Sequence, residues 1–286
     1  MQEHLLFHLA FLGQILLLSF YFPRKILERI KYVLETYPRS NYPKLYPKPL
    51  EHYERARRNY RLMNSIILFA GLILLAVLLG YPRSGKWDHA IATWYFMAQI
   101  FPILLIEIKS FQYYKLMRKA NAGGRRKAEL HPRRLFDFIS PAMLGLTILV
   151  YFAFVGFIIY IDQFGFPWFG GYWNIVGITG INLFFTGIIG WHIYGQKMDP
   201  HQAFQDRRRQ IELIAKSLVL VSIAATLKIA IVIGLAAFEL RHLQPFVTSL
   251  YLQLIALLST GILLRYFRVE DINFEVYKED SIVSVE

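Results

Sequence analysis

Long apolar runs alternate with polar stretches along most of this chain. Seven of the runs are long enough to cross a bilayer, which takes about 20 helical residues. They cover residues 5–22, 63–81, 89–108, 139–161, 172–195, 213–238 and 243–265. A helix that is apolar all round is stable in lipid rather than in water. The sequence therefore predicts an all-α, polytopic transmembrane helical bundle with seven spans.

The polar stretches differ in positive charge, and this difference predicts how the chain is inserted. The three basic stretches are residues 23–62, 109–138 and 196–212. The three stretches with little positive charge are residues 82–88, 162–171 and 239–242. Because cytoplasmic loops accumulate lysine and arginine, the alternation predicts an N-terminus outside and a C-terminus in the cytoplasm. We expect a multi-pass protein of a bacterial inner membrane.

Composition favours a single membrane domain over residues 1–268. Of the 286 residues, 55% are hydrophobic and 18% are charged, which is less charge than soluble domains usually carry. The net charge of +12 would suggest nucleic acid in a soluble protein. Here the excess lies beside the apolar runs, so we expect the lipid bilayer as the partner and no nucleic acid. Cysteine is absent, which excludes a disulfide framework, and the sequence assigns no cofactor.

Two cytoplasmic segments have patterns of their own. After residue 22, the apolar residues Ile26, Ile30 and Val33 recur at helical spacing among charged ones. This pattern predicts an amphipathic helix on the inner leaflet, within a cytoplasmic segment over residues 23–62. Prolines then recur between residues 38 and 49, which favours an extended strip, either a stiff connector or a docking surface. Residues 269–286 form an acidic cytoplasmic tail, solvated by default or lying against the basic loops.

An arginine pair precedes the second, fourth and sixth spans. The pairs are Arg57 and Arg58, Arg133 and Arg134, and Arg208 and Arg209, at a spacing of about 75 residues. Similar apolar and polar residues follow each pair. One reading is an anchor helix followed by three tandem hairpins; the other is that every cytoplasmic boundary attracts arginine independently. In both cases we expect these six arginines at anionic lipid headgroups.

Lys228 is the most costly residue in the predicted spans. It lies 12 residues from Lys216 and 11 from Glu239, the two ends of the sixth span. It is therefore about 17 Å from each end, whereas a lysine side chain reaches only about 6 Å. An ammonium group at this depth costs about 2.5–3.5 kcal/mol on insertion scales. We expect Lys228 to face the bundle interior or water and to find an acceptor.

Three amides lie at a matching depth. Gln99, Asn182 and Gln253 each lie ten residues into the third, fifth and seventh spans from the expected outer end. If the hairpins are repeats, the three amides and Lys228 surround a common centre that binds a ligand. The alternative is that the amides only join helices, at about 0.6 kcal/mol per hydrogen bond.

These residues predict a non-enzymatic protein that binds or transports a polar or anionic small molecule at a midplane site. An accessory or scaffold subunit of a larger membrane complex is the alternative, suggested by the proline strip and the aromatic stretch at residues 163–173. A third class is a lipid-modifying enzyme that uses cytoplasmic residues such as His201. No zinc-protease, P-loop or hydrolase motif is present, so no catalytic or metal-binding residue is assigned.

Overall fold

The protein is an all-α bundle in which seven helical segments are long and apolar enough to cross a membrane. The structure, a computed structural model, describes residues 2–80, 90–120, 133–195 and 199–278. The seven segments are Leu5–Thr36, Leu50–Gly80, Ala90–Lys119, Pro141–Asp162, Trp173–Tyr194, Phe204–Ala237 and Arg241–Tyr266. The prediction of seven spans is confirmed by these helices, and the chain is a polytopic integral membrane protein.

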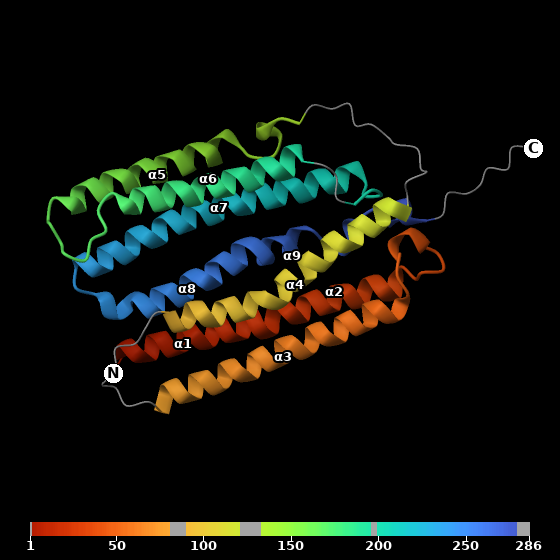
Figure 1. Cartoon of the computed structure of the whole chain (residues 1–286), viewed down its shortest axis with the longest axis horizontal. Coiled ribbons are helices and arrows are strands. Elements are labelled where there is room, and N and C mark those ends of the chain that lie inside the picture. The colour runs from red at the N-terminus through yellow and green to blue at the C-terminus, as the bar shows by residue number, and fades with distance from the viewer. Residues whose placement is uncertain (1, 81–89, 121–132, 196–198, 279–286) are drawn as a thin grey trace, which may run out of the picture.

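The helices run roughly side by side along the long axis of the molecule (Figure 1). The α-helices are α1 Gln2–Leu16, α2 Phe22–Thr36, α3 Leu50–Gly80, α4 Ala90–Ala120, α5 Pro141–Asp162, α6 Trp173–Tyr194, α7 Phe204–Ala237, α8 Gln244–Ala256 and α9 Ile262–Tyr266. The helical turns are η1 Leu17–Tyr21, η2 Pro43–Leu45, η3 Leu135–Asp137, η4 Arg241–Leu243, η5 Leu257–Gly261, η6 Val269–Asp271 and η7 Phe274–Tyr277.

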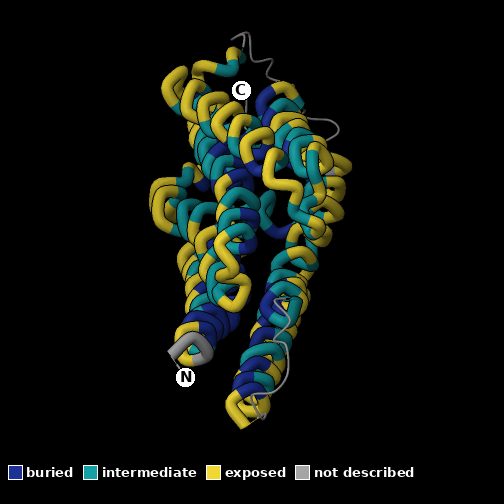
Figure 2. Tube along the Cα trace, turned by 90° about the vertical axis from the view of Figure 1, so that its left-hand side faces the viewer, coloured by how far each residue is buried: buried dark blue, intermediate teal, exposed yellow. Residues whose placement is uncertain are grey.

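The helices form two groups that meet along α7 and α8. In one group, α1, α3, α4 and α8 bury an apolar core around Phe11 and Ile15. In the other, α5 and α6 pack against α7 around Ile158 and Ile178. Figure 2 shows buried residues where helices face one another and exposed residues on the outer turns. We call the line of contact between α7 and α8 the seam.

The seam also joins the two helices of the last hairpin. α7 packs against α5 and α6, and it also contacts η4, α8, η5 and α9 of the seventh span. α8 in turn packs mainly against α1. The arrangement of three tandem hairpins stays a prediction.

The first span and the amphipathic segment form one continuous helix, which differs from the predicted helix on the leaflet. A π-helical turn, η1, joins α1 directly to α2, and Figure 1 shows α2 in line with α1. Pro23 explains the wider turn, because a proline ring clashes with the carbonyl four residues earlier in a regular helix. The turn lets the chain continue as a helix through Pro23.

The proline-rich segment and the tail are folded together, which corrects the extended strip and the solvated tail. Tyr37 stacks on Phe274 with ring centroids 3.9 Å apart. Tyr46 is buried and donates a hydrogen bond of 2.6 Å to the Tyr37 carbonyl. Residues 269–277 form η6 and η7, whose buried Val269 and Phe274 share a core with Met117 at the end of α4. The tail beyond residue 278 lies outside the described residues.

Polar contacts hold this C-terminal segment, residues 269–278, against α7 and the residues before it. Asp271 forms an ion pair of 2.9 Å with Arg209, and the backbone N–H of Asn273 donates to Asp206. The hydroxyl of Tyr277 donates to buried Asp199 over 2.5 Å. Burial, and then the negative charge of Asp199, raises the pKa of Tyr277. Tyr277 therefore stays neutral and keeps donating this hydrogen bond at physiological pH.

Candidate functional site

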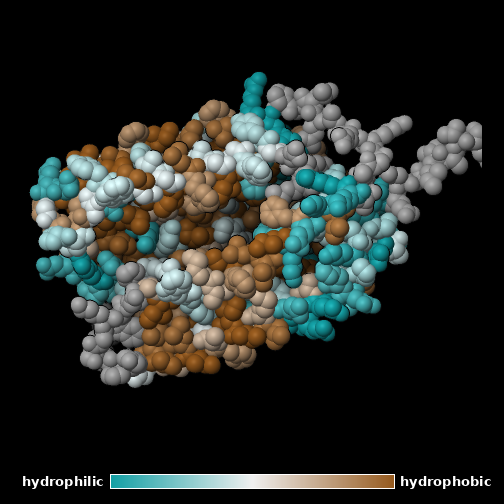
Figure 3. Space-filling model, viewed as in Figure 1, coloured by the Kyte–Doolittle hydropathy of each residue, from teal (hydrophilic) through white to brown (hydrophobic). Residues whose placement is uncertain are grey.

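Lys228 lies on the side of α7 that faces α8, at the seam. Its side chain is half-buried, and its Nζ lies 5.8 Å from the centroid of the Tyr251 ring on α8. This is the geometry of a cation–π contact, which stabilises a desolvated ammonium only in part. Within the described part of the chain, Lys228 has no ion pair and no hydrogen bond to an acceptor. Figure 3 shows a hollow on the displayed face between the two helix groups.

Gln99 and Gln253 contribute to a polar network inside the α1, α3, α4 and α8 group. The network centres on Gln14 of α1, which is fully buried. The Gln14 amide nitrogen donates to Gln99 Oε1 at 3.0 Å and to the Ala92 carbonyl at 3.2 Å. Ser249 of α8 donates to Gln14 Oε1 at 2.8 Å. Gln14 thus links α1 to α4 and α8 through both ends of its amide.

The rest of the network satisfies the two predicted glutamines. Gln99 donates to Ser19 Oγ at 2.9 Å and to the Gln14 carbonyl at 3.2 Å. Gln253 donates to the Ala10 carbonyl at 2.9 Å. Tyr95 extends the network to α3 by donating to the Ile67 carbonyl at 2.9 Å. With these partners in place, the donors of Gln99 and Gln253 join helices rather than point into an open site.

Asn182 lies in the other helix group, apart from both glutamines. Its Oδ1 accepts a hydrogen bond of 2.5 Å from the Ser222 hydroxyl, which fastens α6 to α7. Three residues earlier in α6, Thr179 makes a 2.7 Å hydrogen bond with the Tyr151 hydroxyl of α5. Asn182 and Thr179 therefore act as interhelical contacts that join α6 to α7 and to α5.

The four predicted site residues do not surround a common centre. Gln99 and Gln253 share one network, Asn182 has a separate partner, and Lys228 lies at the seam without an amide neighbour among the residues described. The equal depth of these residues stays a prediction, and depth does not specify the direction in which a side chain points. Gln14 was not among the predicted residues, because the prediction used only amides of the third, fifth and seventh spans. A glutamine in the middle of the first apolar run is the sequence feature that indicates it.

The arginine pairs serve several roles rather than one. Arg133 donates to the Ile193 carbonyl at 3.0 Å, and Arg207 donates to the Gly195 carbonyl at 2.9 Å. Both therefore satisfy carbonyls at the C-terminal end of α6, where a cation also complements the helix dipole. Arg209 is paired with the C-terminal segment, as described above. Four of the six predicted headgroup ligands are exposed, namely Arg58, Arg134, Arg208 and the ion-paired Arg209, and Arg57 is half-buried.

The predicted histidine and acidic residues do not assemble a metal centre in the described ranges. No group of three or more histidine, aspartate or glutamate side chains lies close enough there to hold a metal ion. Asp199 and Asp206 instead hold the C-terminal segment through Tyr277 and Asn273.

Comparison with known proteins gives no further assignment. No protein-family model, no curated protein and no solved structure matches this chain. The fold defines its class, a polytopic integral membrane protein, and function has to be argued from the residues described above.

Proposed function

We propose that the protein is a non-enzymatic membrane protein that binds or transports an anionic small molecule beside Lys228. The observation that carries this proposal is a half-buried ammonium group in the apolar part of α7, for which the Tyr251 ring is the one stabilising partner in the described structure. Such a group costs a few kcal/mol within an apolar span, and charged residues in spans usually serve a function. A bound anion would supply the missing counter-charge.

The surroundings of Lys228 narrow the class of ligand. Gln99 and Gln253 donate hydrogen bonds within the protein and Asn182 accepts one from Ser222, so these three amides add little to recognition. The site then offers one cation and one aromatic face, within an apolar stretch of α7. This chemistry suits a weakly hydrated anion, or a carboxylate with an apolar body, better than a sugar or a metal ion.

The place of Lys228 in the fold supports access by a ligand. The seam is where the two helix groups meet, and packing within each group is more extensive than packing between them. Sites between helix groups are where many transporters bind substrate near the bilayer midplane. The distribution of positive charge supports an outside N-terminus, a cytoplasmic C-terminus and a bacterial inner membrane as part of the same proposal.

Thermal unfolding in detergent with a panel of anions tests this function. Chloride, phosphate, acetate and benzoate are added separately to the wild type and to Lys228→Met and Lys228→Arg. A ligand at about 100 times its dissociation constant stabilises the folded state by about 2.7 kcal/mol. We expect at least one anion to raise the Tm of the wild type and of Lys228→Arg but not that of Lys228→Met. Equal responses of all three proteins to every anion would contradict the proposal.

A further inference from the structure

A second cavity lies at the basic end of the molecule, away from Lys228. It has a volume of 610 Å³, within the range of about 300–1,000 Å³ that small-ligand sites usually have. Its walls come from α2, the first turns of α3, the last turns of α4 and the C-terminal segment. These elements meet at the end of the molecule where Figure 3 shows hydrophilic side chains gathered.

The walls of this cavity are largely apolar although it lies at the polar end. Ile30 and Val33 come from α2, Ile106 comes from α4, and Val269 and Ile272 come from the C-terminal segment. Apolar surface left in contact with water costs about 25 cal/mol per Å². An apolar ligand group in the cavity would remove this cost, whereas a small hydrophilic ion would not.

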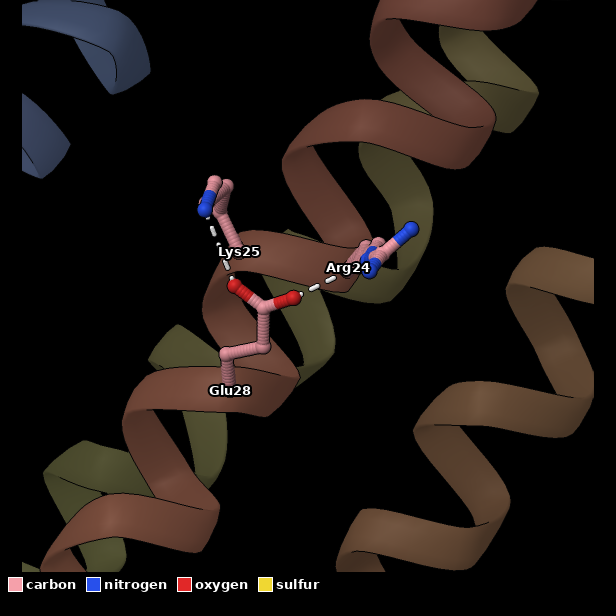
Figure 4. Close-up of polar contacts among 3 residues, drawn as sticks. All are labelled: Arg24, Lys25 and Glu28. Atoms are coloured by element: carbon pink, nitrogen blue, oxygen red, sulfur yellow. Dashed lines mark hydrogen bonds and ion pairs between the residues drawn. The ribbon is translucent and has the colours of Figure 1, made fainter.

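The charges that line the cavity are all positive. They belong to Arg29, Lys48, Arg57 and Lys109, and no carboxylate is among the described residues that line it. The nearest acidic residue on α2, Glu28, is already held by Arg24 at 2.9 Å and Lys25 at 3.0 Å (Figure 4).

Glu270 is the acidic residue that acts on Arg29. It is exposed and lines a neighbouring hollow of 470 Å³ instead. The cavity itself therefore presents apolar walls with Arg29, Lys48, Arg57 and Lys109 among them, and no carboxylate of the described residues lines it.

Two helices, α3 and α4, place the cavity at the depth of lipid headgroups. The hydrocarbon core is about 30 Å thick, which about 20 helical residues cover. In α3 the residues from 61 to 80 cover this distance, and Arg57 and Tyr60 of the cavity come just before them. In α4 the residues from 90 to 109 cover it, and Tyr113 follows. A lipid in the adjoining leaflet has its headgroup at the same level.

We infer that this cavity binds one anionic phospholipid, with an acyl chain against the apolar walls and the phosphate near Arg57 and Lys109. The ligand needs both an acyl chain and an anionic headgroup. The apolar walls disfavour a free phosphate, and the exclusively positive lining charges disfavour a zwitterionic headgroup. The inference does not depend on Lys228, which lies in the last third of α7 and lines neither this cavity nor the neighbouring one.

Native mass spectrometry of the full-length protein in detergent tests the inference. The probes are dioleoyl phosphatidylglycerol, dioleoyl phosphatidylcholine and glycerol 1-phosphate, each titrated separately. We expect one phosphatidylglycerol to bind per protein at low concentration, with at least roughly tenfold weaker binding of phosphatidylcholine and no binding of glycerol 1-phosphate. Equal binding of the two lipids, or binding of glycerol 1-phosphate, would overturn the inference.

Matched variants locate the bound lipid. Arg57→Gln combined with Lys109→Gln removes two lining charges, and Ala56→Trp fills the cavity. Arg58→Gln is the control, since Arg58 is exposed and does not line the cavity. We expect the double variant and Ala56→Trp each to weaken phosphatidylglycerol binding at least roughly tenfold, with no change in the control. Unchanged binding in either cavity variant, with a helical circular dichroism spectrum like that of the wild type, would overturn it.

Discussion

The polar residues within the apolar helices fall into two kinds, distinguished by whether the protein itself satisfies their hydrogen-bonding groups. Gln14, Gln99 and Ser249 are buried and hydrogen-bonded to one another across three helices. Lys228 is half-buried and meets only the ring of Tyr251 within the described structure. Residues of the first kind hold the fold together. A residue of the second kind costs stability, which is why we assign function to Lys228.

This difference predicts opposite effects on stability. Lys228→Met removes an uncompensated charge, so it should raise the free energy of unfolding by up to about 3 kcal/mol. Gln14→Leu removes three side-chain hydrogen bonds and leaves Gln99 and Ser249 short of a partner. At about 0.6 kcal/mol per bond, it should lower the free energy of unfolding by about 2 kcal/mol.

Thermal unfolding of both variants in the same detergent, without added anion, checks the two signs together. A loss of stability in Lys228→Met would make the lysine a structural residue and contradict its assignment.

At the scale of elements, the regular helices were predictable and their ends were not. The spans follow from local hydrophobicity, which the sequence shows directly. The continuation of α1 into α2 depends on a π-helical turn that accommodates Pro23, and the end of α6 depends on Arg133 and Arg207 from distant segments. Likewise, the C-terminal segment is folded because Phe274 meets Tyr37, far away in the sequence. Such contacts cannot be read from composition or periodicity.

The C-terminal segment should be released by a single large-to-small substitution. Phe274→Ala removes a ring that is 7% exposed and stacked on Tyr37. A buried phenylalanine contributes about 3–5 kcal/mol relative to alanine, which exceeds the stability of most short segments. We expect trypsin to cleave at Arg268 much faster in Phe274→Ala than in the wild type. Ile272→Val is the control, and equally fast cleavage in the wild type would show that the segment is not held.

The proline-rich segment should loosen at alkaline pH. Burial raises the pKa of Tyr46 to about 12, whereas its ordinary value is 10. A group with a raised folded-state pKa stabilises the fold fully below its unfolded pKa, and this contribution is lost as pH rises through the folded value. The stability due to Tyr46 should therefore decline between pH 10 and pH 12.

The Tm measured across this pH range checks the prediction for Tyr46. The decline should be smaller in Tyr46→Phe, which cannot ionise at this position. An identical pH dependence in the wild type and Tyr46→Phe would contradict it.

At the scale of the whole molecule, seven spans were predictable but their grouping was not. Arginine spacing suggests three tandem hairpins, but it does not predict that α7 packs against α5 and α6 or that α8 packs against α1. The basic boundaries indicate only which side of the membrane a loop lies on, and they carry no information on which helices touch. The same reasoning explains why matching positions along their spans do not bring Gln99, Asn182 and Gln253 to one site.

The proposed orientation can be tested with single cysteines, because the chain contains none. Gln163→Cys and Asn59→Cys each place one exposed thiol at opposite ends of the bundle. With an outside N-terminus, a membrane-impermeant maleimide should label Gln163→Cys in intact cells. It should label Asn59→Cys only after the membrane is opened. The reverse pattern would show that the chain is inserted the other way.

The central claim is that an anion neutralises Lys228 within the membrane. The most direct measurement is a density map of the wild-type protein, prepared with the anion that raises its Tm. We predict density for that anion within about 3 Å of Lys228 Nζ, the usual length of a charge-assisted hydrogen bond. The same map of Lys228→Met should lack it. Lipid acyl chains alone around Nζ of the wild type would contradict the account.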